Sequence, residues 1–159
     1  GGRPVVPPVV ADAGVPFEIV PGLTTAVAAP ALAGIPVTHR GTSPGFVVIN
    51  GSSEAAYSAI VDAIPPGLIT LVAMMAMGSR APLIQRLLNR GWRPEMPAAI
   101  VVGASTPQMW TWRGTLGAMN AVVVPADSAE APGTIVVGEV AGLQIEAIET
   151  LDRLEEVAS

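Results

Sequence analysis

The chain has 159 residues, of which 50% are hydrophobic and 13% are charged, and its net charge is −5. This length and composition suffice for one domain with a buried core. The absence of cysteine excludes disulfides, thiolate catalysis and thiolate metal sites, and a single histidine argues against a histidine-based zinc site.

Short runs of valine and isoleucine predict strands, and they alternate with segments of helical periodicity. In chain order, the pattern predicts a short helix at 9–14, a buried strand at 17–20, a helix at 24–33, a strand at 46–49, a helix at 53–64, a strand at 68–73, a helix at 79–89, strands at 98–102 and 109–113, a short helix at 115–120, a strand at 134–137 and a helix from 143 onward. Strands followed by helices favour parallel pairing. We expect an α/β fold with a mixed, mostly parallel sheet of about five strands flanked by helices, in which 109–113 is an antiparallel member.

Charge is concentrated at the end of the chain, where six acids but only one base, Arg153, lie between Glu139 and Ser159. No basic stripe occurs, so nucleic acid is not an expected partner. No apolar stretch reaches the roughly 18–20 residues of a membrane span, and the start lacks the pattern of a signal peptide. We therefore expect a cytoplasmic protein without a membrane partner. All eight basic residues are arginine, which reflects either genomic base composition or bidentate binding of carboxylates.

Common nucleotide and hydrolase motifs are absent: there is no dinucleotide-binding glycine motif, P-loop, nucleophile elbow or zinc-protease helix. A family pattern is present instead. Its most specific part is the string GIPVTHRG, and the matching segments are 16–26 (PFEIVPGLTTA), 33–41 (AGIPVTHRG), 70–78 (TLVAMMAMG), 97–107 (PAAIVVGASTP), 114–116 (GTL) and 135–143 (IVVGEVAGL). In this order they resemble the uroporphyrinogen-III C-methyltransferases, a branch of the tetrapyrrole methylases.

The resemblance implies two α/β domains with the methyl donor, S-adenosylmethionine, in the cleft between them, and no metal. Most of the first domain would precede residue 1. The expected organisation is a donor-loop remnant and interdomain linker at 1–22, the C-terminal methylase domain at 23–143, and an acidic helix at 144–159.

The resemblance also implies donor-binding residues. The opening GGRP is similar to the family's donor loop GGDP, with Arg3 in place of the acid and about seven residues missing after Val6. The implied donor-binding set is Gly1, Gly2, Arg3, Val6, Thr24, Thr25, Met75, Ala104 and Gly133. Glycine and alanine allow close backbone approach, and threonines at a helix start offer hydroxyl and amide groups. Two alternatives stay open: Thr24 as a plain helix cap, and Met74, Met75 and Met77 as core fillers.

Substrate binding requires positively charged side chains, because uroporphyrinogen carries eight carboxylates. Arg40 is the best candidate. His39 beside it orients the substrate, accepts a proton, or is a buried, hydrogen-bonded histidine. Arg80 and Arg113 are further candidates, with solvated surface charge as the alternative. Trp110 and Trp112 share one face of a strand, where they either cover the core or line a cleft or subunit contact.

The implied function is methylation of uroporphyrinogen III at C2 and C7 to precorrin-2, in siroheme or cobalamin synthesis, by a homodimer. No general base is assigned, because the sulfonium donor is a strong electrophile and positioning supplies most of the catalysis. The alternatives are a non-catalytic methylase domain that only folds or dimerises, a methylase of a later precorrin, and an interaction module that works through the acidic C-terminal helix.

Overall fold

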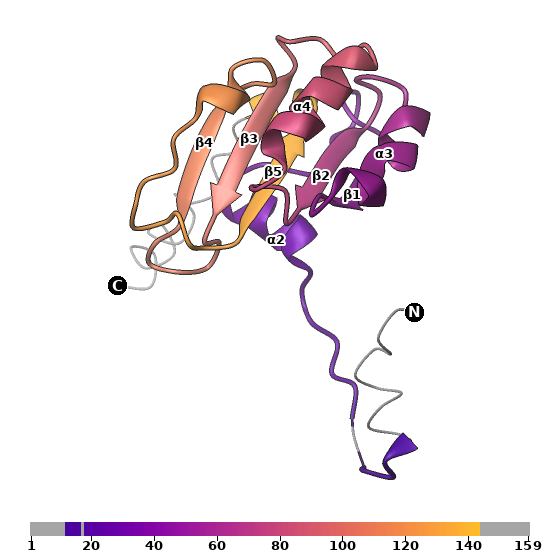
Figure 1. Ribbon diagram of the computed structural model, residues 1–159, viewed down its shortest axis with the longest axis vertical. Coiled ribbons are helices and arrows are strands. Elements are labelled where there is room, and N and C mark those ends of the chain that lie inside the picture. Colours follow the sequence, from indigo (N-terminus) through magenta and orange to yellow (C-terminus); the bar gives the residue numbers. More distant parts are fainter. Residues whose placement is uncertain (1–11, 17, 144–159) are drawn as a thin grey trace, which may run out of the picture.

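The structure is a computed structural model that describes residues 12–16 and 18–143. Most of the helix expected at 9–14 and the acidic helix expected at 144–159 lie outside the described residues. Within them, one mixed β-sheet is covered by helices on both faces (Figure 1).

The sheet has five strands in the order β1-β2-β5-β3-β4. They are β1 (Phe46–Asn50), β2 (Thr70–Met74), β3 (Pro97–Val102), β4 (Trp110–Thr115) and β5 (Gly133–Val137). β1 and β2 pair in parallel, whereas β2–β5, β5–β3 and β3–β4 are antiparallel. The predicted α/β fold with a mixed five-stranded sheet is thus confirmed, including the antiparallel strand near 109–113.

The expectation of mostly parallel pairing needs correction. β1, β2 and β3 do run in one direction, as the strand–helix order predicts. The last strand, β5, inserts between β2 and β3 in the opposite direction, which replaces a parallel neighbour by two antiparallel ones. Sequence order gives no sign of this insertion, because it is a long-range pairing.

The helices form two outer layers. α3 (Glu54–Ala63) and α4 (Arg80–Asn89) cover one face of the sheet, and α2 (Thr25–Leu32) lies on the other (Figure 1). Alternate residues of the strands face the two layers, because side chains in a strand point to opposite sides. The larger core lies under α3 and α4, and the smaller one is formed by Ile35, Ala99, Val136, Val140 and Ala141. Val140 and Ala141 belong to a short 3-10 helix, η2 (Glu139–Gly142).

The helix α2 begins where the sequence predicts, with Thr24 as its N-cap: the Thr24 Oγ1 accepts a hydrogen bond from Ala26 N at 3.3 Å. It buries only Ala26, Ala29 and Pro30 against the sheet. Small side chains let the helix axis approach the strands closely, but they bury little apolar area. Further contacts are therefore needed to fix this helix.

Two local predictions differ from the structure, and one N-cap position lacks its side-chain hydrogen bond. The strand expected at 17–20 is wrong: residues 18–20 form no strand, and Ile19 and Val20 are 73% and 78% exposed, because this segment leads away from the sheet and has no strand to pair with (Figure 1). The helix expected at 115–120 is a 3-10 helix, η1 (Met119–Ala121). Ser53 occupies the N-cap position of α3, but its side chain makes no capping hydrogen bond.

No helix in the part of the chain that the structure describes is both long enough and apolar enough to cross a membrane.

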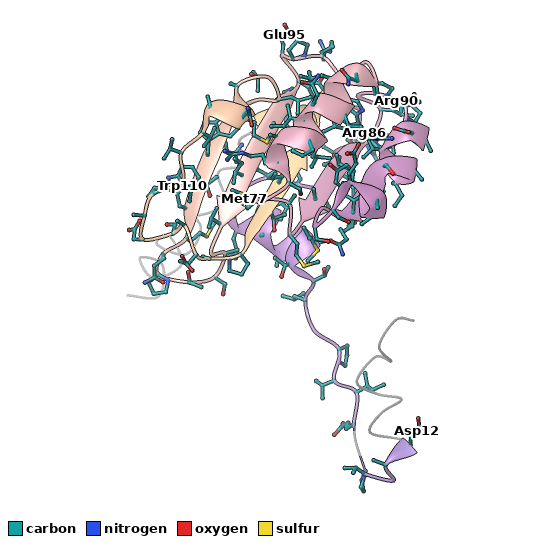
Figure 2. The ribbon with its side chains drawn as sticks, viewed as in Figure 1. Asp12, Met77, Arg86, Arg90, Glu95 and Trp110 are labelled. Atoms are coloured by element: carbon teal, nitrogen blue, oxygen red, sulfur yellow. The ribbon has the colours of Figure 1, made fainter. Side chains whose placement is uncertain are left out.

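Arg86 of α4 and Arg90, its C-cap residue, join this helix to α3 (Figure 2). Arg86 Nε and Nη2 donate to the Asp62 carboxylate at 2.9 and 2.6 Å, and Arg86 Nη1 donates to Glu54 Oε1 at 2.6 Å. Arg90 Nη2 donates to the backbone carbonyl of Asp62 at 2.6 Å. Hydrogen bonding to Arg86 lowers the pKa of Asp62 below its usual value, because it stabilises the ionised carboxylate.

This pKa shift predicts a pH-dependent effect of Asp62→Asn. Because the folded-state pKa is lowered, the stabilisation by the Asp62 carboxylate is present above its unfolded-state pKa and is lost as the pH falls through the folded-state pKa. The melting temperature of the variant should be below that of the parent at pH 7, and the two should converge below about pH 4. Thermal melts from pH 3 to 8 check this; a gap that is constant across this range would contradict it.

Gly51 marks a close contact between the ends of β1 and β2. Its amide donates to Met74 O at 2.7 Å, and its carbonyl accepts a hydrogen bond from the Ser79 hydroxyl. A Cβ at Gly51 would lie 2.4 Å from Ala76 Cβ and 2.9 Å from Ala76 Cα. Neither the Cβ atom nor the backbone can move away independently, so only glycine fits.

Gly51→Ala should therefore destabilise the fold by about 1–3 kcal/mol, the usual cost of overpacking. Gly78→Ala is the matched control, because nothing lies within 4 Å of a Cβ at Gly78. Urea unfolding of both variants measures the difference, and equal midpoints would show that the contact relaxes without cost.

Candidate functional site

The ends of β2 and β3 meet at one edge of the sheet. Both strands are antiparallel to β5, which lies between them, so their carboxyl ends flank the start of β5. Met74 pairs with Thr134, and Val102 pairs with Gly133. Met75 and Ala104, which follow these strands directly, therefore lie at the same edge. In open α/β sheets, ligands bind at the carboxyl ends of strands.

The backbone at this edge is strained. Among the described residues, Met75 (φ 55°) and Ser105 (φ 69°) are the non-glycine residues with positive φ. This region is unfavourable for side chains with a Cβ, and such strain concentrates at binding and catalytic sites. Both residues lie just beyond the carboxyl end of a strand, so the strain marks this edge independently of any sequence motif.

A hollow of about 600 Å³ opens between α2 and the turn that follows β3. Most of its lining is apolar, and it consists of Leu23, Thr25, Ala28, Ala29, Ala31, Leu32, Ala104 and Ser105. Its volume falls within the range of small-molecule sites, which are mainly apolar with a few polar groups that orient the ligand. The alanines of α2 leave this space open because they lack longer side chains.

The structure brings Thr25 and Ala104 together in this hollow, although 78 residues separate them in the sequence. Met75 lies at the same edge and is 61% exposed, so it does not fill the core. Thr24 uses its hydroxyl for the α2 cap, which leaves its predicted donor contact as a prediction.

Gly133 also lies at this edge, but Met77 occupies the space beside it. A Cβ at Gly133 would lie 2.5 Å from Met77 Cγ and 2.8 Å from its Sδ. Gly133 thus leaves room for Met77, which contacts the larger core as the core-filler alternative predicts. A donor contact of Gly133 stays a prediction.

The turn that carries Ala104 and Ser105 is held by hydrogen bonds to a following loop. Gly103 N donates to Pro132 O at 3.0 Å, and the Ser128 hydroxyl donates to Gln108 O at 3.0 Å. Within the turn, the Thr106 hydroxyl donates to Gly103 O at 2.7 Å. One wall of the hollow is therefore fixed before any ligand binds.

His39 and Arg40 lie at the opposite end of the sheet. They line a second hollow of about 650 Å³, together with other residues of 38–44 and with Gly67 and Leu68, which precede β2. The length of β2 separates this region from Met75 by about 13 Å, at roughly 3.3 Å per residue. The structure therefore does not bring His39 and Arg40 next to the predicted donor residues.

His39 is exposed, with Nδ1 at 3.3 Å from Thr42 Oγ1, so it is not the buried histidine of the alternative interpretation. Arg40 is exposed as well. Of the arginines in the described part of the chain, Arg40 is the one without a hydrogen bond or ion pair to another described residue. Its guanidinium is available for a carboxylate.

The other two arginine candidates have structural contacts. Arg113 donates to the carbonyls of Ala141, Leu143 and Ala33 at 3.1, 2.7 and 2.6 Å, which ties β4 to η2 and to the end of α2. Arg80 donates to the carbonyls of Asn120 and Val122 at 3.3 and 2.9 Å. These bonds show that neither arginine is merely solvated surface charge.

Trp110 and Trp112 both pack against the larger core from β4, which confirms the predicted shared face and favours core cover. Gly1, Gly2, Arg3 and Val6 lie outside the described residues. Within those residues, no cluster of three or more His, Cys, Asp or Glu side chains could hold a metal ion.

Sequence reasoning missed most of the hollow's wall, namely Leu23, Ala28, Ala29, Ala31, Leu32 and Ser105. The run of small residues in α2 was a usable signal, because a helix lined with alanine leaves room for a ligand. Ser105 has no such signal, because its positive φ becomes visible only in the structure.

The family model of the tetrapyrrole (corrin/porphyrin) methylases matches residues 7–120 of this chain. A uroporphyrinogen-III C-methyltransferase of Methanocaldococcus jannaschii is 37% identical over 128 residues, which are 79% of this chain and 52% of that protein. A siroheme synthase of Tolumonas auensis is 36% identical over 135 residues, 82% of this chain and 27% of that protein.

Among solved structures, the uroporphyrin-III C-methyl transferase of Thermus thermophilus complexed with S-adenyl homocysteine is similar, with a TM-score of 0.65 and 31% identity. The match covers 84% of this chain and 57% of that one. The chain thus spans about half the length of the methyltransferases it matches.

The contrast between Arg113 and Arg40 gives a stability prediction. Arg113→Ala should lower the free energy of unfolding by about 2 kcal/mol or more, because it removes charge-assisted hydrogen bonds and leaves carbonyls unpaired. Arg40→Ala is the control with the same chemical change and should leave stability within about 0.5 kcal/mol of the parent. Chemical denaturation of both variants checks this, and similar losses for both would contradict the structural role of Arg113.

Proposed function

The chain belongs to the tetrapyrrole methylase family, and from that premise we propose that it transfers methyl groups from S-adenosylmethionine to uroporphyrinogen III. The observation that carries the proposal is the mainly apolar hollow between α2 and the turn after β3, which Thr25 and Ala104 line together. The donor would occupy this hollow, with Met75 at the same edge.

The wall of alanine and leucine suits an adenine ring, which binds mainly by excluding water from its faces. Ala104 has no side chain beyond Cβ, so the ring can approach the backbone of the turn. Met75 is exposed in a left-handed conformation, which offers its thioether and backbone groups to the ligand. Thr25 adds a hydroxyl at the first turn of α2, where the positive end of the helix dipole favours polar or anionic groups.

The reaction needs little side-chain chemistry. The donor supplies an electrophilic methyl group on a sulfonium, and a nucleophilic pyrrole carbon of the substrate takes it, so alignment of the two is the main task. The hydrogen bonds that fix the turn at 103–109 provide part of this alignment before binding. We assign no general base.

Arg40, and His39 beside it, would bind carboxylates of the substrate, since Arg40 is exposed and lacks a partner among the described residues. Their distance from the donor hollow suits peripheral carboxylates rather than the reacting carbon. The expected product is precorrin-2, formed in the cytoplasm by a homodimer for siroheme or cobalamin synthesis. Thr24 and Gly133, together with Gly1, Gly2, Arg3 and Val6, stay predicted donor-binding positions.

A ligand titration with a blocking variant tests the donor site. S-Adenosylhomocysteine at about 100 times its Kd should stabilise the parent by about 2.7 kcal/mol, a melting shift of roughly 5–10 °C. Ala104→Leu should abolish most of the shift, because the added side chain enters the hollow. Ala118→Leu is the control, because Ala118 is exposed and does not line the hollow. This variant should show the same melting shift as the parent.

An assay with uroporphyrinogen III then separates the remaining possibilities. Precorrin-2 as product supports the proposed reaction. Ligand binding without methylation supports a non-catalytic methylase domain, and methylation of only a later precorrin identifies another branch of the family. A parent protein that shows no shift with S-adenosylhomocysteine contradicts the donor site itself.

A further inference from the structure

We propose that the Ser105 hydroxyl binds the adenosyl part of the methyl donor; this rests on the proposed function and names a ligand contact that the family resemblance does not assign. The first observation is position. Ser105 lines the hollow beside Ala104, and the other lining side chain with a hydrogen-bonding group is Thr25. An apolar wall with two hydroxyls leaves few ways to orient a polar nucleoside.

The second observation is the hydrogen bonding around Ser105. The hydroxyl of Thr106 donates to Gly103 O, and that of Ser128 donates to Gln108 O, so both stabilise the turn and its neighbouring loop. The Ser105 hydroxyl makes no hydrogen bond to any residue that the structure describes. It is exposed at the hollow and free to bind a ligand.

The third observation is the backbone. Ser105 has φ 69°, close to the 61° of Gly103 two residues earlier, where the chain has the residue suited to this conformation. A serine at such a position costs on the order of 1 kcal/mol that a glycine would not. What serine has and glycine lacks is a hydroxyl, here on a residue that lines the hollow. Strain of this kind at a lining residue points to a role in binding rather than in stability.

A hydroxyl both donates and accepts, so it can bind the adenine edge or a ribose hydroxyl; both belong to the adenosyl group. The apolar surfaces of Leu23 and Leu32 in the same hollow suit the ring faces. The amino-acid part of the donor carries charges, and none of the described residues that line this hollow has a charged side chain. The adenosyl group is therefore the part that Ser105 contacts.

The test is Ser105→Gly, which should weaken ligand binding without lowering stability. The melting temperature should stay equal or rise, because glycine relieves the positive φ. The Kd for S-adenosylhomocysteine, measured by calorimetry, should rise by roughly 3–10-fold, the effect of one lost hydrogen bond. Ser105→Ala removes the hydroxyl but keeps the strain, so it should show the same loss of affinity without the gain in stability.

Ser58→Ala, in α3 on the opposite face of the sheet, is the control for affinity and should leave the Kd unchanged. 5′-Methylthioadenosine lacks the amino-acid part of the donor. Its affinity should fall by the same factor in Ser105→Gly. The proposal would be overturned, with the donor site left intact, if only the affinity for S-adenosylhomocysteine fell or if the affinities for both ligands were unchanged. A parent that binds neither ligand would overturn the proposed function as well.

Discussion

The fold depends on one strand, β5, which comes last in the described sequence and lies at the centre of the sheet. All five of its residues are buried, and it pairs along its length with β2 on one side and β3 on the other. Its side chains enter both cores: Ile135 and Val137 the larger one, and Val136 the smaller. Because β5 runs against its neighbours, it sets the ends of β2 and β3 at a common edge, and the ligand hollow lies there.

The hollow lies between the turn after β3 and the helix α2, and the fold must hold these two segments at a fixed distance. The turn after β3 is fixed by backbone and serine hydrogen bonds to the loop before β5. The helix α2 buries only small side chains, so the bond from Arg113 to Ala33 at its end is an important second anchor. Because the walls of the hollow are already ordered, little conformational entropy is lost when a ligand binds. More of the contact free energy then contributes to affinity.

Sequence patterns located all five strands of the sheet and the helices α2, α3 and α4 to within about two residues, because the apolar runs are short and clearly bounded by glycine and proline. They could not show that β5 separates β2 from β3, since periodicity carries no information about long-range pairing. They placed 17–20 as a strand because three of its four residues are apolar, although residues 18–20 form no strand in the structure. At the site, the family resemblance supplied Thr25 and Ala104, whereas Ser105 and the alanine wall required three-dimensional placement. Arg113 had a charge that suggested substrate binding, but its neighbours turned out to be carbonyls.

The central position of the last strand has a consequence for synthesis. While the ribosome is still producing residues before Gly133, β2 and β3 are both complete but each lacks the partner that fills the gap between them. The nascent chain therefore carries two unsatisfied strand edges and an open apolar interior until about residue 137 emerges. Folding of this sheet is completed late rather than built up strand by strand, and chaperone contacts during translation should be most useful in that interval.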